Sequence, residues 1–159
     1  MNFIFFMPDE LRAESLGCYG HPLVRTPNID ALGGQGTRFD QCHVQNTVCT
    51  PSRCSMMTGW YPHVRGHRTL WHLLRPDEPN LLRYLKQNGY EVMWFGKNDL
   101  LAQASFAESV TCAETHGTKM YNFDLLPPDD PRHFTFLAGP VTGPLEEHTD
   151  CANVLAAVR

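Results

Sequence analysis

A cysteine, a proline and an arginine stand within five residues of one another in Cys49-Thr50-Pro51-Ser52-Arg53. Because proline is typical of the first turn of a helix, Cys49 is predicted at a helix N-terminus. The free N–H groups and the helix dipole there favour a thiolate or a bound oxyanion such as sulfate or phosphate. Arg53 could bind the same oxyanion through two hydrogen bonds. The segment therefore suggests a nucleophile beside an anion site, although a buried structural cysteine and a surface arginine would fit it too.

An acidic pair, Asp9-Glu10, directly follows the apolar run 2–7. If that run is a strand of a parallel sheet, the pair lies at the carboxyl edge, where α/β folds bind their ligands. Carboxylate oxygens suit a hard cation such as calcium or magnesium. Taken alone, the pair fits a solvated turn equally well.

The elements that would position these residues alternate between strands and helices, which indicates an α/β fold with a mainly parallel sheet flanked by helices. The predicted strands are 2–7, buried on both faces, a short 37–44, and 90–96. The predicted helices are 27–33, 51–58, 80–88, 99–108 and one from 145 that still continues at 159, with a loop-rich stretch over 111–143. Two clear strands are few for such a sheet, which suggests that the chain is part of a larger unit.

Composition narrows the class of protein further. The chain has 159 residues, a net charge of −4 and 42% hydrophobic residues, as expected for one globular domain. No basic surplus points to nucleic acid or to a membrane surface. The apolar start is too short for a signal peptide or a membrane span, so the default location is cytoplasmic, or periplasmic or secreted if a signal was removed. The six cysteines are expected to be free thiols.

The cysteine segment and its surroundings resemble the type I sulfatases, members of the alkaline phosphatase-like superfamily. The family signature is Cys or Ser, any residue, Pro, Ser and Arg, then Thr-Gly, matched here by residues 49–53 and by Thr58-Gly59. The stretches PDELRAESLGCYGHP, TPNIDAL, GTRFDQCHVQN and GYEVMWFGK also resemble ordered landmarks of the family. The resemblance runs from residue 3 to about 100 and implies the sulfatase fold, with residues 1–159 as the N-terminal part of its catalytic domain.

The resemblance implies that Cys49 is a precursor. In these enzymes a maturation enzyme recognises the cysteine segment and oxidises the cysteine to formylglycine. One hydroxyl of the aldehyde hydrate attacks sulfur and displaces the alcohol. The second hydroxyl then loses its proton and expels sulfate, which restores the aldehyde. A sulfated sugar or another sulfated small molecule would be the substrate.

The resemblance also assigns a metal site and its neighbours. Asp9, Glu10 and residue 49 would bind calcium, or alternatively magnesium or manganese, although the family usually has Asp where Glu10 stands. Arg53 would hold the formylglycine, and Lys97 would contact the substrate sulfate. Many sulfatases have a histidine two residues after this lysine, where this chain has Asp99. His67, downstream of the signature, is the first candidate to donate to sulfate or to the leaving oxygen, with a structural histidine as the alternative.

Family members are several hundred residues long and complete the metal site from their far half. We therefore expect residues 1–159 alone to be inactive. The sequence leaves open a relative that cleaves phosphonate or phosphate esters. It also leaves open a non-catalytic zinc or redox module built on Cys42, His43, Cys49 and Cys54, whose spacing departs from the usual closely spaced zinc ligands.

Overall fold

The computed structural model describes residues 1–116, 129 and 143–159. Two strands, β1 (Met93–Phe95) and β2 (Cys112–Glu114), pair in parallel with Trp94 opposite Ala113. The α-helices are α1 (Pro27–Gln35), α2 (Cys49–Thr58), α3 (Leu81–Gln87), α4 (Phe106–Ser109) and α5 (Thr149–Val158). The short 3-10 helices are η1 (Ala13–Ser15), η2 (Gly17–Tyr19), η3 (Gln103–Ser105) and η5 (Leu145–Glu147). This is the predicted α/β class with parallel strand pairing and flanking helices.

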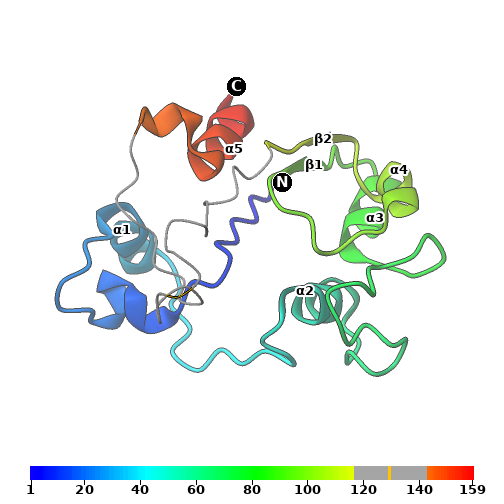
Figure 1. Ribbon diagram of the computed structural model, residues 1–159, viewed down its shortest axis with the longest axis horizontal. Helices are drawn as coiled ribbons and strands as arrows, with labels where there is room; N and C mark the ends of the chain where they lie inside the picture. Colours follow the sequence, from blue (N-terminus) through cyan, green and yellow to red (C-terminus); the bar gives the residue numbers. More distant parts are fainter. Residues whose placement is uncertain (117–128, 130–142) are drawn as a thin grey trace.

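The core lies between α2, α3 and the segment that follows β1. Leu74, Leu100 and Leu101 are completely buried there, and Cys54 and Met57 of α2 pack against the same cluster. Leu74 is held in place by backbone hydrogen bonds to Leu100 and Ala102. In Figure 1 these elements form one side of the molecule, and α1 with the two preceding 3-10 helices forms the other. The N-terminal segment runs between the two sides.

The local signals of α2 and α3 act as predicted. Pro51 lies in the first turn of α2, and Gly59 ends the helix with φ 73°, a left-handed conformation that glycine adopts at little cost. Asn80 caps α3 by accepting a hydrogen bond from the Arg83 N–H. The glycine fixes where α2 ends and the asparagine fixes where α3 begins, and Cys49 is the first residue of α2.

The prediction of a buried strand over 2–7 is wrong in this structure. Residues 1–8 belong to no strand, and the side chains of Phe3 and Ile4 are 63% and 95% exposed. Phe3 does contact Tyr90, just before β1, with ring centroids 5.8 Å apart. A strand needs hydrogen-bonded neighbours, and within the described residues no backbone hydrogen bond joins this segment to β1 or β2.

Other boundaries differ from the prediction for identifiable reasons. The predicted strand 37–44 has no regular structure in the described chain. Helix α1 continues through Gly33 and Gly34, since glycine weakens a helix by only about 1 kcal/mol per residue. The predicted helix 99–108 begins later, as η3 followed by α4, and β2 lies inside the stretch predicted as loop. Most of 111–143 lies outside the described residues.

Candidate active site

Helix α2 places Cys49 and Arg53 one turn apart. Cys49 is half-buried at the N-terminus of the helix, whereas Arg53 is 5% exposed. The side chain of Thr50 donates a hydrogen bond to the Leu70 carbonyl oxygen at 3.1 Å. This bond ties the start of the helix to the loop that follows it. The first turn of α2 is therefore a fixed support for a reacting group at position 49.

Arg53 joins three segments that are far apart in the sequence. Its Nη1 donates to the carbonyl oxygens of Lys97 and Asn98, each at 3.1 Å, and its Nη2 donates to Asp9 Oδ1 at 3.1 Å. The sequence analysis expected this guanidinium to grip an oxyanion or the formylglycine. In the structure its hydrogen bonds hold the segment after β1 and the acidic turn after residue 7 against α2.

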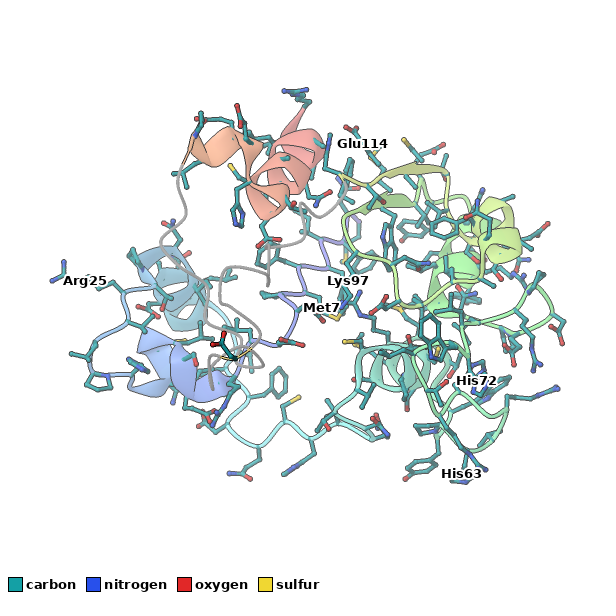
Figure 2. All side chains as sticks on the ribbon, viewed as in Figure 1. Met7, Arg25, His63, His72, Lys97 and Glu114 are labelled. Carbon is teal, nitrogen blue, oxygen red and sulfur yellow. The ribbon has the colours of Figure 1, made fainter. Side chains whose placement is uncertain are left out.

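Lys97 lies at the centre of the site. Its Nζ is 2.6 Å from Asp9 Oδ2, 3.0 Å from Asp99 Oδ2 and 3.6 Å from Cys49 Sγ. Figure 2 shows Lys97 beside the segment that carries Met7, near the middle of the molecule. We call Asp9, Cys49, Arg53, Lys97 and Asp99 the Lys97 cluster. It brings together four residues that the sequence analysis selected from separate parts of the chain, with Asp99 in addition.

Charge pairing fixes the protonation of the two central groups. Burial by itself would raise the pKa of Asp9, but hydrogen bonds from Lys97 and Arg53 hold that pKa below its ordinary value. Burial would likewise lower the pKa of Lys97, but Asp9 and Asp99 raise it well above the ordinary value. Lys97 is therefore a cation and Asp9 an anion throughout the neutral range.

Two residues of the site have left-handed backbones. Among the described non-glycine residues, positive φ occurs at Glu10, with 58°, and at Asp99, with 40°. Such conformations are unfavourable for residues with a Cβ and tend to persist where the surrounding structure requires them, often at functional sites. Glu10 directly follows Asp9, and Asp99 lies two residues after Lys97, so both left-handed residues lie in the segments that form the Lys97 cluster.

The donors of this site fit a hard cation only in part. Asp9 supplies two carboxylate oxygens next to Cys49, and the ammonium group of Lys97 already shows that a positive charge is stabilised between them. Glu10 is exposed, and its side chain makes no hydrogen bond with a described residue. Within residues 1–116, 129 and 143–159 no group of three His, Cys, Asp or Glu side chains is arranged to hold a metal. Calcium takes six to eight oxygen ligands, so further ligands are needed.

The sequence matches the Sulfatase family model over residues 1–129. The chain belongs to the sulfatase family. Its curated relatives include the N-acetylglucosamine-6-O-sulfatase of Bacteroides thetaiotaomicron, which is 33% identical over 102 residues, covering 64% of this chain and 18% of that protein. They also include the mouse (Mus musculus) iduronate 2-sulfatase, 38% identical over 100 residues, covering 61% of this chain and 18% of that protein.

Solved structures agree with this assignment of family. The structure of a protein in complex with its substrate D-glucosamine-2-N,6-O-disulfate matches with a TM-score of 0.61 and 33% identity, over 64% of this chain and 21% of that protein. The sulfatase chain thus spans about one-fifth of the length of the relatives that it matches. No described helix of the chain is long and apolar enough to cross a membrane.

The second cysteine of α2 differs from the first in its environment. Burial raises the pKa of Cys54 to about 12, and the negative charge of Glu78 adds to this effect. The Cys54 thiol is 1% exposed and lies 4.0 Å from the carbonyl oxygens of His72 and Leu100. All six cysteines of the sulfatase chain are free, as predicted. Since Cys54 is a buried thiol and Cys42 an exposed one, the structure does not gather the thiols of the alternative zinc module.

This contrast predicts the order of thiol labelling in the native protein. At pH 8 a thiol with a pKa of about 12 is about one part in 10⁴ thiolate, so Cys54 should react at least 100-fold more slowly with iodoacetamide than the exposed Cys42. Raising the pH from 7 to 9 should not bring the labelling rate of Cys54 close to that of Cys42, because pH 7 and pH 9 both lie far below the pKa of Cys54. Peptide mass spectrometry of time points measures both rates. Equal labelling of the two residues would contradict the buried position.

His67 is not brought to the Lys97 cluster. It is 4% exposed, and its ring nitrogens face the His72 carbonyl oxygen and the Glu78 carboxylate. A donor role toward substrate would require breaking one of these contacts. The predicted site also lacked one residue, because Asp99 was left without a firm role. The signal available in the sequence was its position two residues after Lys97.

Proposed function

We propose that this protein hydrolyses sulfate esters at the Lys97 cluster. The observation that carries the proposal is the convergence of Asp9, Lys97 and Arg53 on the first turn of α2, with Lys97 Nζ 3.6 Å from Cys49 Sγ. A fixed ammonium group beside the nucleophile position suits an anionic substrate, because it stabilises the charge that grows on the sulfate oxygens. The family and the sulfatase-like neighbours support the same reaction.

Residue 49 supplies the nucleophile in this proposal after oxidation to formylglycine. The half-exposed Cys49 side chain at a helix N-terminus remains accessible, whereas Cys54 is buried. A maturation enzyme that recognises the segment Cys49–Arg53 would act before folding, since Pro51 and Arg53 are buried in the native chain. In the folded enzyme, Arg53 then positions the turn after β1, and Lys97 orients the sulfate.

Asp9 is the best candidate to hold the metal, with residue 49 as its neighbour and Glu10 as a further ligand. When bound, a calcium, magnesium or manganese ion would act as a Lewis acid and favour ionisation of the nucleophilic hydroxyl. A metal ion bound at Asp9 would take this carboxylate from Lys97, and Asp99, the second carboxylate that pairs with Lys97, would keep Lys97 beside position 49. Asp99 thus takes a positioning role where many sulfatases have a histidine.

We further propose that residues 1–159 are the N-terminal portion of a sulfatase catalytic domain and are inactive alone. Among the described residues, too few donors lie together to complete a metal site, which supports this proposal. The chain also spans only about one-fifth of the length of its relatives. The proposed substrate is a sulfated sugar or a similar sulfated small molecule. The solved neighbour whose substrate is D-glucosamine-2-N,6-O-disulfate supports a sugar.

A comparison of two substrates tests the reaction class. The full-length protein that contains these residues, produced with a maturation enzyme, should hydrolyse an aryl sulfate at least 100-fold faster, in kcat/KM, than an aryl phosphonate of the same leaving group. The 159-residue chain alone should hydrolyse neither. A preference for the phosphonate would assign the protein to the phosphonate or phosphate ester hydrolases, and metal-dependent turnover by the isolated chain would contradict the need for a second portion. Zinc bound through thiolates would favour the non-catalytic module.

A further inference from the structure

A buried carboxylate lies outside the proposed catalytic cluster. Glu78 is completely inaccessible to solvent and accepts hydrogen bonds from the Arg75 N–H at 2.8 Å and from Arg75 Nη2 at 2.9 Å. Its Oε1 also lies 3.1 Å from His67 Nε2. Burial by itself would raise the pKa of Glu78, but the hydrogen bonds from Arg75 and the charge of His67 hold it below its ordinary value. A buried anion of this kind is stable only with such partners, because an unpaired one costs several kcal/mol.

The partners of His67 indicate its protonation. His67 Nδ1 lies 2.6 Å from the His72 carbonyl oxygen, while Nε2 faces the Glu78 carboxylate. A carbonyl oxygen and an ionised carboxylate can only accept hydrogen bonds. Both ring nitrogens must therefore carry a hydrogen, which makes His67 an imidazolium ion. The pair is then a buried ion pair that also fixes a backbone carbonyl.

The segment between these two residues, 67–78, packs under the start of α2, and we call it the His67 loop. Its Leu70 carbonyl accepts the hydrogen bond from Thr50, the residue that follows Cys49. Its His72 carbonyl, fixed by His67, lies 4.0 Å from Cys54 Sγ on the same helix. The loop therefore contacts both the first and the second turn of α2.

The far end of the His67 loop is tied to the segment that carries Lys97. The Leu74 N–H donates to the Leu100 carbonyl at 2.8 Å, and the Ala102 N–H donates to the Leu74 carbonyl at 2.9 Å. Asp99, which pairs with Lys97, directly precedes Leu100. One loop thus contacts the segment that holds the nucleophile position and the segment that holds the sulfate-binding lysine.

We propose that Glu78 is a positioning residue, which acts through a doubly protonated His67 to hold the His67 loop and, through it, the relative placement of Cys49 and Lys97. This inference rests on the proposed function for its effect on catalysis, but the ion pair itself does not. It assigns His67 a supporting place in the reaction instead of contact with the substrate. It also assigns a function to Glu78, which the sequence analysis did not select.

Two substitutions at one position separate charge from geometry. In Glu78→Gln, the amide oxygen can still accept from the Arg75 N–H, and the amide NH₂ can donate to a neutral His67 that keeps Nδ1–H toward His72. The half-exposed Arg75 guanidinium, which shares Oε1 with His67, then loses this acceptor and can turn to solvent. In Glu78→Leu, no acceptor or donor remains. Full-length protein with Glu78→Gln should keep kcat within about threefold, whereas Glu78→Leu should lose about 100-fold, the cost typical of a misplaced reacting group. The matched control is Asp77→Asn, an exposed acid in the same loop that should change kcat less than twofold.

A spectroscopic measurement tests the ion pair without reference to activity. Long-range ¹H–¹⁵N spectra of the full-length protein should show two protonated ring nitrogens on His67 at pH 7.5, and one in Glu78→Gln. Amide exchange at 69–74 should accelerate at least tenfold in Glu78→Leu but not in Asp77→Asn. A neutral His67 in the unaltered protein, or unchanged exchange in Glu78→Leu, would overturn the proposal.

The same measurements separate this proposal from the proposed function. If the His67 spectra and the amide exchange are as expected but no sulfatase activity is found, the proposed function fails while the ion pair stands. If Glu78→Leu does not fold, the His67 spectra of the unaltered protein and of Glu78→Gln still decide.

Discussion

Replacing Cys49 by alanine should lower kcat/KM for an aryl sulfate by about 10⁴-fold or more, as loss of a covalent nucleophile does in other hydrolases. Alanine cannot be oxidised to an aldehyde, so no hydroxyl would be placed next to Lys97 Nζ. Helix α2 should still form, because the Cys49 side chain does not cap it: the N-cap residue is Val48, and Gly59 ends the helix. The measurement is steady-state turnover of full-length protein, with circular dichroism to confirm folding.

Cys42→Ala is the matched control, since Cys42 is an exposed free thiol outside the Lys97 cluster. It should leave turnover within twofold. The peptide containing residue 49 should weigh about 18 Da less in the active, unaltered protein, the change from a thiol-bearing carbon to an aldehyde. Full activity of Cys49→Ala would refute the proposed nucleophile. Activity with an unmodified cysteine would refute the formylglycine alone.

Replacing Asp9 by asparagine should lower kcat by about 10³-fold, a loss comparable to removal of a strong electrostatic contact in a transition state. Asparagine keeps the shape of the side chain but removes the charge that Arg53 and Lys97 share. It would also remove the carboxylate that we propose as the first metal ligand. Calorimetric titration of metal-stripped, full-length protein with calcium should show binding that is lost in Asp9→Asn.

Asp40→Asn is the matched control, because Asp40 is an exposed acid that pairs with Arg38 and lies outside the cluster. It should change neither calcium binding nor kcat. Glu10→Gln should have a smaller effect than Asp9→Asn, since Glu10 is exposed and has no hydrogen-bond partner among the described residues. If Asp9→Asn bound calcium as tightly as the unaltered protein, the metal would have to be held elsewhere.

Local signals in the sequence were enough to predict the helix that begins at Cys49 and the helix capped by Asn80. A proline in the first turn, an asparagine at the N-cap and a glycine at the C-terminus act within a few residues, so they can be recognised without tertiary structure. The choice of Asp9, Arg53 and Lys97 came from motif resemblance together with the positions of apolar runs. The structure brings these three side chains into contact.

The strand predicted over 2–7 shows where such signals fail. Its residues have high β-propensity, but a strand also needs partners with free N–H and C=O groups, and no described strand pairs with this segment. Strand β2 was missed for the opposite reason, because Cys112–Glu114 is short and has little pattern of its own, and its pairing with β1 decides its conformation.

By itself, the sequence indicated the family, the proposed nucleophile position and the helices that begin near Cys49 and after Asn80, because these depend on residue types at short spacing. Only the tertiary structure decided the partners of Arg53, the pairing of Lys97 with Asp99, and the burial of His67 against Glu78. Each of these depends on residues 2 to 45 positions apart whose side chains meet only after the chain has folded. Spacing along the chain does not fix such distances, whereas packing of α2 against the segment after β1 does.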